Sequence, residues 1–386
     1  TSPPNQLRYC ALGEDLGLSC LLALRHLSLD LMRNVALLLL VALFACSCAT
    51  STHLTKRQGE PADYLVIDLS DGPKASHYPV THLTGVPKGG WTDDYRTTKM
   101  VFRRIPAGIF TMGSPANEWG HDCFYEVQHE VTLTRPFFIG VFEVTQRQWE
   151  RVMGSWLGSY ARLCESRPAG TVNYTWIRGW DAGTNWPASN GVDRNSFMGR
   201  LRARTGLAFD LPTEAQWEYA GRAGTATALN SGFGITNAVA APQPTQCLWE
   251  DVGPARTTAA FDSVYDIANA VDRHMTEVGR YFYNGGKDFG GSVDSPPATA
   301  RVGSYRPNAW GLYDIHGNVW EWCLDWHGQY TGAGLDPTGA ASGWGRVVRG
   351  GSWNNNALYC RIAYRGNLHP AGASHHVGFR VALPNL

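Results

Sequence analysis

Turn-forming residues interrupt the chain from about Met100 to its end at short, regular intervals. Glycine, proline and asparagine break both the 3.6-residue period of an amphipathic helix and the alternation of a strand. The chain has 43 glycines among 386 residues, together with 15 tryptophans and 16 tyrosines. We therefore expect a loop-rich domain of short elements, in which aromatic side chains supply much of the buried surface.

Short segments between these turns predict local strands and helices. Residues 144–152 predict a helix with Thr145 as its N-cap, and residues 212–220 predict a second helix capped by Thr213. Glu214 favours the N-terminus of that second helix because of the helix dipole. Strands are expected at residues 101–104, 131–133 and 137–139.

A secretory signal pattern lies inside the N-terminal part. Met32 and Arg33 precede an apolar run, residues 35–45, which Cys46 follows. A basic start and a short apolar run are typical of a signal peptide, and the run is too short to span a membrane comfortably. Residues 43–46 resemble a bacterial lipobox, so Cys46 is the predicted lipidation site and Cys48 a second candidate. The alternative is an ordinary signal peptide with an incidental cysteine.

This pattern predicts the domain organisation and the localisation. Residues 1–31 are expected to be an over-extended, disordered N-terminus, and residues 32–45 a lipoprotein signal segment. Residues 46–99 are expected to form a tether and a short N-terminal segment before a folded domain at 100–386. The protein is predicted to be exported and anchored by lipid in the membrane of a bacterial envelope or cell surface.

Net charge bears on the class of partner, and cysteine content bears on disulfide formation. The formal net charge is zero, which argues against nucleic acid as a partner because such binders normally carry a basic surplus. Disulfides are allowed in an exported compartment, but the sequence does not show how the remaining cysteines pair.

Six blocks from residue 101 onward resemble, in order, the formylglycine-generating enzyme family, also called the sulfatase-modifying factor family. The resemblance implies an α+β domain with a C-type-lectin-like fold, with short antiparallel strands, two packed helices and long ordered loops. The blocks are FTMGS (110–114), FEVTQRQW (142–149), LPTEAQWEYAGRAG (211–224), RPNAWGLYDIHGNVWEW (306–322), RVVRGGSW (346–353) and GFRVA (378–382).

In the sulfatase-activating members of that family, two cysteines after the GGS block bind copper and oxidise a substrate cysteine. Here Asn355 stands at the first cysteine position, and Cys360 stands at the second by one count only. An amide cannot replace a thiolate as a ligand of Cu(I). Cys360, the only weak catalytic candidate, is then a small buried residue or half of a disulfide, with Cys323 as a possible partner. We expect neither copper nor the histidine-bound iron of a related branch.

The resemblance also implies a structural calcium site. By residue-for-residue match, its ligands are the Asp314 and Glu321 carboxylates and the carbonyls of Gly317 and Val319. Calcium takes several hard oxygen ligands, which such a loop can supply. The alternative is a hydrogen-bonded turn in which Glu321 forms a salt bridge with an arginine such as Arg349.

The C-terminal region, residues 346–383, also resembles the variable region of diversity-generating-retroelement variable proteins, many of which are surface lipoproteins. An ordinary family member with the same C-terminus is the alternative. Tyr, Asn and His on glycine-anchored loops offer adaptable contacts, as in antibody binding sites. The predicted ligand contacts are Asn354, Asn356, Leu358, Tyr359, Ile362, Tyr364, Asn367, Leu368, His369, His375 and His376.

The leading hypothesis is a surface lipoprotein that binds an unknown protein or surface ligand through its C-terminal loops. One alternative is a metal-dependent oxidase of the same family with relocated ligands. A second is a structural component of envelope assembly.

Overall fold

The computed structural model describes residues 62–155, 164–235, 272–284, 299–330 and 332–384. These residues belong to one compact unit, Pro61–Leu386. The signal pattern and Cys46 lie outside the described residues. Within the described ranges, no helix is long and apolar enough to cross a membrane.

The folded unit begins earlier than the sequence indicates. Residues 62–99, predicted as the end of a tether and a short N-terminal segment, contain β1 (Tyr64–Asp68) and β2 (Val80–Leu83). Strand β1 is almost fully buried and pairs antiparallel with β3 (Lys99–Ile105). The predicted domain boundary at residue 100 is therefore wrong, because β1 and β2 complete the sheet to which β3 belongs.

The largest sheet is antiparallel and has the strand order β14-β6-β3-β1-β2. Its remaining strands are β6 (Phe137–Gly140) and β14 (Ala382–Pro384). Strand β14 closes the sheet with residues from the C-terminus, which ties the two ends of the domain together. The strands predicted at 101–104 and 137–139 are confirmed within β3 and β6.

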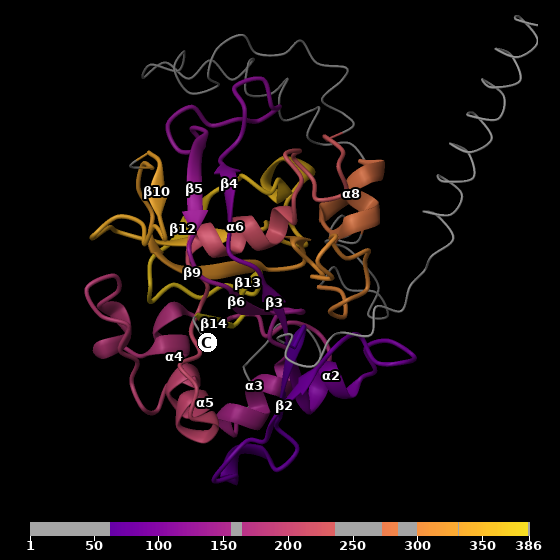
Figure 1. The fold of residues 1–386 in the computed structure, drawn as a ribbon, viewed down its shortest axis with the longest axis vertical. Helices are drawn as coiled ribbons and strands as arrows, with labels where there is room; N and C mark the ends of the chain where they lie inside the picture. The colour runs from indigo at the N-terminus through magenta and orange to yellow at the C-terminus, as the bar shows by residue number, and fades with distance from the viewer. Residues whose placement is uncertain (1–61, 156–163, 236–271, 285–298, 331, 385–386) are drawn as a thin grey trace, which may run out of the picture. The chain divides into compact units, whose positions relative to one another are not determined.

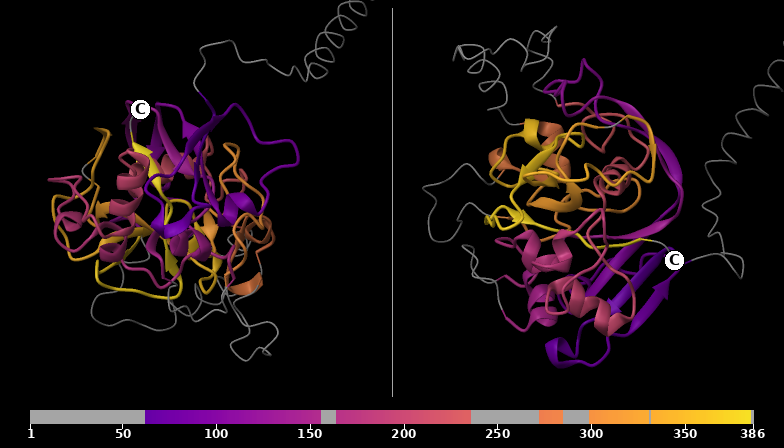
Figure 2. Two further views of the ribbon diagram at one scale, coloured as in Figure 1. Left: turned by 90° about the horizontal axis from the view of Figure 1, so that it is seen from below. Right: turned by 90° about the vertical axis from the view of Figure 1, so that its left-hand side faces the viewer.

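Three smaller sheets carry the rest of the strands. The C-terminal residues, yellow in Figure 2, lie beside the orange elements that precede them, because β11, β12 and β13 join the sheet around β9. The pairs β10–β5, β13–β9 and β7–β8 are parallel, which the expectation of antiparallel strands did not include. One sheet contains β4 (Gly108–Met112), β5 (His129–Leu133) and β10 (Gly334–Leu335); another contains β9 (Trp320–Trp326), β11 (Arg346–Arg349), β12 (Gly366–Leu368) and β13 (Val377–Gly378); the third pairs β7 (Gly279–Arg280) with β8 (His316–Gly317).

The two predicted helices are present with their predicted caps. In α3 (Gln146–Met153) the Thr145 side chain accepts from the Gln148 N–H, and in α6 (Glu214–Arg222) Thr213 accepts from Gln216. Both helices have a complete capping box, which explains why the sequence located them. The two predicted helices are not the pair that packs together: α3 packs against α5. The other helices are α2 (Asp94–Thr97), α4 (Tyr174–Arg178), α5 (Phe197–Thr205) and α8 (Arg273–Val278).

Aromatic side chains fill the core, as the composition predicts. Trp149 stacks on Phe197, and both lie against Phe379. Figure 1 shows α3, α4 and α5 together at one end of the unit and β4, β5 and β10 at the other. The C-terminal loops between β11 and β14 are thus held on a scaffold of packed aromatic residues.

Candidate functional site

The arginines of the C-terminal segment are all buried. Their side chains point into the molecule and donate to buried carboxylates and to backbone carbonyls. Because each charged head has several partners, the arginines hold the loops in place and do not present charge to solvent. They are Arg346, Arg349, Arg361, Arg365 and Arg380.

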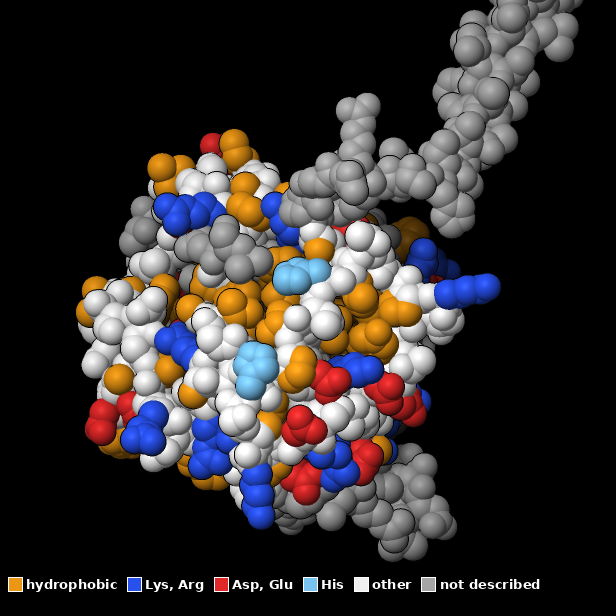
Figure 3. Space-filling view, turned by 60° about the horizontal axis from the view of Figure 1, so that its bottom comes forward, with side chains coloured by type: hydrophobic (Ala, Val, Ile, Leu, Met, Phe, Trp, Pro, Cys, Tyr) orange, Lys and Arg blue, Asp and Glu red, His pale blue; other side chains and the backbone are white. Residues whose placement is uncertain are grey.

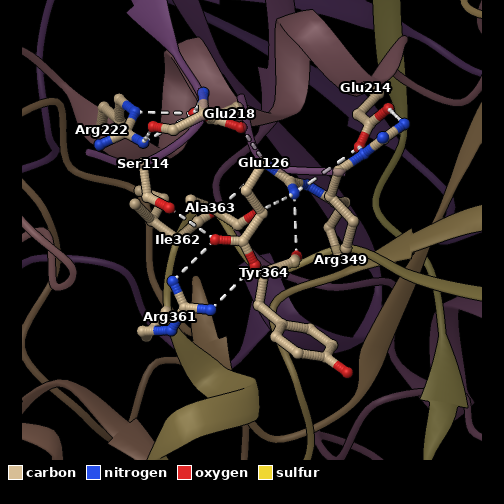
Figure 4. A network of polar contacts seen from close by, with 12 residues as sticks. Ser114, Glu126, Glu214, Glu218, Arg222, Arg349, Arg361, Ile362, Ala363 and Tyr364 are labelled. Carbon is tan, nitrogen blue, oxygen red and sulfur yellow. Dashed lines mark hydrogen bonds and ion pairs between the residues drawn. The ribbon is translucent and has the colours of Figure 1, made fainter. Parts of the chain in front are cut away.

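Arg361 joins the segment to a distant loop (Figure 4). Its guanidinium donates to both oxygens of Glu126, at 2.8 and 2.9 Å, and to Glu118 at 2.6 Å. Ser114 donates a further hydrogen bond of 2.6 Å to Glu126. Burial raises the pKa of Glu126, but Arg361 outweighs burial and the pKa lies below its usual value. The pair is therefore ionised and fully satisfied at neutral pH.

Arg349 and Arg365 attach the segment to α6 in a similar way. Arg349 donates to Glu218 and to the carbonyls of Ile362, Ala363 and Tyr364, as Figure 4 shows. Arg365 forms a bidentate ion pair with Glu214, with hydrogen bonds of 2.6 and 2.7 Å. These contacts fix the backbone on both sides of the turns that carry the predicted ligand contacts.

Most of the predicted ligand contacts lie on the surface between these anchors. Asn367, His369 and His375 are exposed. The half-buried ones are Asn354, Leu358, Tyr359, Tyr364, Leu368 and His376. The structure thus separates an inward-facing frame from an outward-facing set within one stretch of chain.

Several of these side chains contact one another. The rings of Tyr359 and Tyr364 lie 5.0 Å apart, edge to face. His375 lies 5.2 Å from His376, whose Nδ1 lies 3.5 Å from the Asn354 amide. Burial, together with His375, lowers the pKa of His376 to about 4, so His376 is neutral at physiological pH.

Two of the predicted contacts do not reach the surface. Ile362 is fully buried and packs in the core near Ala220 and Ile315. Asn356 is buried because its side chain accepts from the Leu358 N–H and caps a short helical turn, Ala357–Cys360. The prediction that these two residues contact a ligand is wrong, since both stabilise the loop from inside.

One exposed aromatic residue escaped the sequence prediction. Trp344 is 69% exposed and lies 5.7 Å from His369, ring to ring. It precedes the segment that the resemblance marks, so only its structural neighbour identifies it. Figure 3 shows a face on which hydrophobic side chains gather next to histidine side chains.

Cys360 lies in a hydrophobic cluster with Trp119, Tyr281 and Ala357 and has no exposed surface. It is a free thiol, as is Cys323, which lies in a different cluster. The prediction of a small buried residue is confirmed, and the predicted alternative of a disulfide between the two is wrong. Burial raises the pKa of the Cys360 thiol far above its usual range, so the thiolate that copper or a substrate would need is absent at neutral pH.

The predicted calcium loop has one ligand already engaged. Both oxygens of Glu321 accept from Arg380, at 2.6 and 2.9 Å, and one also accepts from the Trp217 indole N–H at 2.7 Å. This is the predicted salt bridge, but the arginine is Arg380 and not Arg349. Because both oxygens of its carboxylate already accept hydrogen bonds, Glu321 does not fit the predicted set of calcium ligands.

Asp314, by contrast, has an oxygen to spare. Its Oδ2 accepts from the Gly303 N–H at 2.6 Å, whereas its Oδ1 is buried without a partner. Burial and the Asp314 carboxylate raise the pKa of Glu143 well above its usual value, and burial raises that of Asp314 to about 6. Both oxygens of Glu143 already accept hydrogen bonds, from the Asn318 side chain at 2.5 Å and the Val319 N–H at 3.1 Å, so the free acceptor of this pair is Asp314 Oδ1. Across the described ranges, no group of three or more His, Cys, Asp or Glu side chains is arranged to hold a metal.

Residues 92–384 match the family model described as a sulfatase-modifying factor enzyme 1-like domain. The chain belongs to this family. The predicted membership and the predicted α+β fold are therefore confirmed.

Family members with an assigned activity are similar over different lengths. The formylglycine-generating enzyme of Streptomyces coelicolor is 44% identical over 95 residues, which are 23% of this chain and 30% of that enzyme. The enzyme of that name from Bos taurus is 27% identical over 323 residues, 75% of each chain. The chain thus spans about a third of the length of the first bacterial relatives that it matches, 30% and 34%.

Among solved structures, Treponema denticola variable protein 1 is similar with a TM-score of 0.50 and 24% identity. The match covers 75% of this chain and 96% of that one. At this level of sequence identity, the match shows only that the two proteins share a fold. The sulfatase-modifying-factor-type domain described here thus shares its fold with a variable protein.

Proposed function

We propose that this sulfatase-modifying-factor-type domain binds a protein or surface ligand through its C-terminal loops and does not oxidise cysteine. The observation that carries the proposal is the division of residues 346–383 into a buried arginine frame and a set of exposed Asn and His with half-buried Tyr and Leu side chains. Such a division suits recognition, because residues at the loop surface can contact a ligand without disturbing the fold.

The chemistry of the surface indicates the kind of ligand. The segment contains no Lys, Asp or Glu, and its arginines are buried. Aromatic and amide side chains provide contact area and adaptable hydrogen bonds. A partner with a neutral contact patch fits best, and binding is expected to depend only weakly on salt concentration.

Site-specific photo-crosslinking in the intact bacterial envelope tests the proposal. A photo-reactive residue replaces His369 or His375 on the proposed surface, and His82, exposed on β2, is the matched control. We expect a discrete crosslinked product from the first two positions and none from His82. Equal labelling at all three positions, or none anywhere, would contradict a ligand surface on these loops.

The oxidase alternative would need a thiol pair. Cys360 is buried and protonated, Asn355 occupies the other position, and Cys323 lies in a separate cluster. The envelope-assembly alternative uses the same surface and differs from a ligand receptor only in the permanence of the contact. A single stoichiometric crosslinked partner, present under all growth conditions, would favour assembly.

We also propose that the protein is an exported lipoprotein with Cys46 as the lipidated residue. The apolar run before a cysteine supports this. Cys46→Ala is expected to abolish palmitate labelling and membrane fractionation. Labelling that persists and disappears only in Cys48→Ala would move the site to Cys48.

Calcium is proposed as a structural ion at Asp314, with Glu143 in place of Glu321 as the second carboxylate. The free Asp314 oxygen and the mutual repulsion of the two acids support a cation there. Added calcium is expected to raise the melting temperature by mass action, and Asp314→Asn together with Glu143→Gln should remove that effect. The exposed Asp94→Asn is the control; an unchanged calcium effect in the double variant would reject the site.

A further inference from the structure

A cavity of about 310 Å³ lies against the glycine-rich loop that includes β10. Its walls come from elements far apart in sequence: Asp325 from β9, Glu214 from the start of α6, Met112 from β4 and His129 from β5. A volume of this size lies at the lower end of the range of small-molecule sites. None of the predicted C-terminal ligand contacts lines it, so it is a separate region from the proposed ligand surface.

Asp325 lines the cavity and offers it a carboxylate acceptor. Asp325 is only 2% exposed. Its Oδ2 accepts from the Glu214 N–H at 2.8 Å, and its Oδ1 has no hydrogen-bond partner among the described residues. A donor placed in the cavity could bond to this oxygen, and an ammonium would form a charge-assisted hydrogen bond with it.

The charges around the cavity favour a cationic donor. Glu214 is neutralised by Arg365, which also donates to the carbonyls of Tyr125 and Gly328. Asp325 has no such direct ion pair. Burial, followed by the Glu214 carboxylate, raises the pKa of Asp325 to about 7, and Arg365 and Arg346 oppose this by less. An entering positive charge would relieve the repulsion between the two acids, whereas an anion would add to it.

A second hollow of about 250 Å³ adjoins the first, since both are lined by His129, Gln329, Tyr330 and Gly332. The further walls of the second hollow include Phe124 and Val127, which are 42% and 51% exposed. On the side of the first cavity Leu335 is 72% exposed. Exposed apolar side chains beside a polar cavity offer a place for an apolar group.

Tyr330 is one of the residues that line both hollows. Its ring lies 4.4 Å from the His129 ring and 4.0 Å from the Arg365 guanidinium. These contacts hold the ring in place beside both hollows. A ligand that spans both hollows needs a donor at one end and an apolar group at the other.

We propose that these adjoining hollows bind a small primary amine that carries an apolar group. The ammonium donates to Asp325 Oδ1, and the apolar group lies against Phe124 and Val127. The site extends beyond the proposed function, because it shares no side chain with the C-terminal contact surface.

Titration calorimetry on the full chain tests this proposal with three probes of one shape: benzylamine, benzyl alcohol and benzoate. We expect saturable binding of benzylamine at millimolar concentrations, weaker binding of benzyl alcohol and none of benzoate. Asp325→Asn keeps the shape and removes the charge, so it should weaken benzylamine binding by about tenfold or more. Glu130→Gln, which removes an exposed charge on β5 outside the cavity, should leave binding unchanged.

A second variant tests the cavity without any change at Asp325. Ala340→Phe adds volume at the loop that lines the cavity, without a change of charge or core, and should also abolish binding. Thermal melting checks that each variant is folded. Absence of benzylamine binding to the parent, equal binding of benzyl alcohol or benzoate, or unchanged binding in both variants would overturn the proposal. None of these outcomes bears on the photo-crosslinking at His369 and His375.

Discussion

The C-terminal segment and the cavity at Asp325 both offer polar groups to a ligand, but they treat charge in opposite ways. In the C-terminal segment every arginine is buried, and four of the five form ion pairs, as Arg361 does with Glu126, so the exposed side chains are uncharged. In the cavity, Asp325 is buried and keeps one oxygen without a partner. Ion pairs that neutralise buried charge produce a stable frame, whereas a carboxylate without a counter-charge produces a site that selects a ligand by charge.

The largest effect is expected from breaking the frame. Arg361→Ala leaves Glu126 and Glu118 buried without their cation, and removal of one partner of such a pair costs about 3–5 kcal/mol. Arg147→Ala is the matched control, because Arg147 is partly exposed in its pair with Glu150 and its loss should cost about 1 kcal/mol or less. Urea denaturation measures both; equal losses would show that the arginine frame is unimportant.

A smaller loss of stability is expected at Cys360. Cys360→Ser places a hydroxyl in a hydrophobic cluster, where the Ser352 carbonyl that accepts from the Cys360 Sγ at 4.0 Å is too distant for an O–H donor, which should destabilise the fold by about 1–3 kcal/mol. Cys164, a free and half-exposed cysteine, supplies the control: Cys164→Ser should change stability by about 0.5 kcal/mol or less. A fully stable Cys360→Ser protein would remove the structural role assigned to this thiol.

The pH dependence of stability tests whether the Asp325 carboxyl in the cavity differs from the ion-paired carboxylates of the frame. The folded-state pKa of Asp325 is raised from 3.8 to about 7, so between these values the folded protein holds a proton that the unfolded chain has released. Stability should therefore fall as pH rises through this range, and Asp325→Asn should flatten the slope. Melting temperatures of the two proteins from pH 4 to pH 8 measure it, and identical slopes would contradict a raised pKa at Asp325.

The smallest effects on stability are expected from substitutions at exposed positions of the C-terminal loops. Asn367→Ala and His369→Ala, both at exposed positions, should change the free energy of unfolding by about 0.5 kcal/mol or less. The same changes should weaken the crosslinking described above. A large loss of stability in either variant would mean that these residues belong to the frame and not to the ligand surface.

Local signals in the sequence predict local structure well. Thr145 and Thr213 identify α3 and α6 because a helix cap and its partners lie within a few residues. The family blocks predict the fold and the position of the C-terminal loops. The sequence also places the small buried cysteine correctly at Cys360.

The parts that the sequence did not predict depend on contacts between distant residues. Ile362 and Arg361 are adjacent in the chain, yet nothing local indicates that one fills the core and the other pairs with Glu126, 235 residues away. Glu321 resembles a metal ligand until Arg380 is found against it. The cavity at Asp325 has no local signal either, since β9, α6, β4 and β5 each supply one part of its wall.

The central claim is that the C-terminal loops form a binding surface on a buried frame and not an oxidase site. The most direct measurement is aerobic conversion of cysteine to formylglycine on a Cys-x-Pro-x-Arg peptide, followed by mass spectrometry, with the full chain supplied with copper. No conversion is expected, because Cys360 is buried and protonated and Asn355 stands at the other cysteine position. Conversion by the parent protein that disappears in a folded Cys360→Ser variant would contradict it.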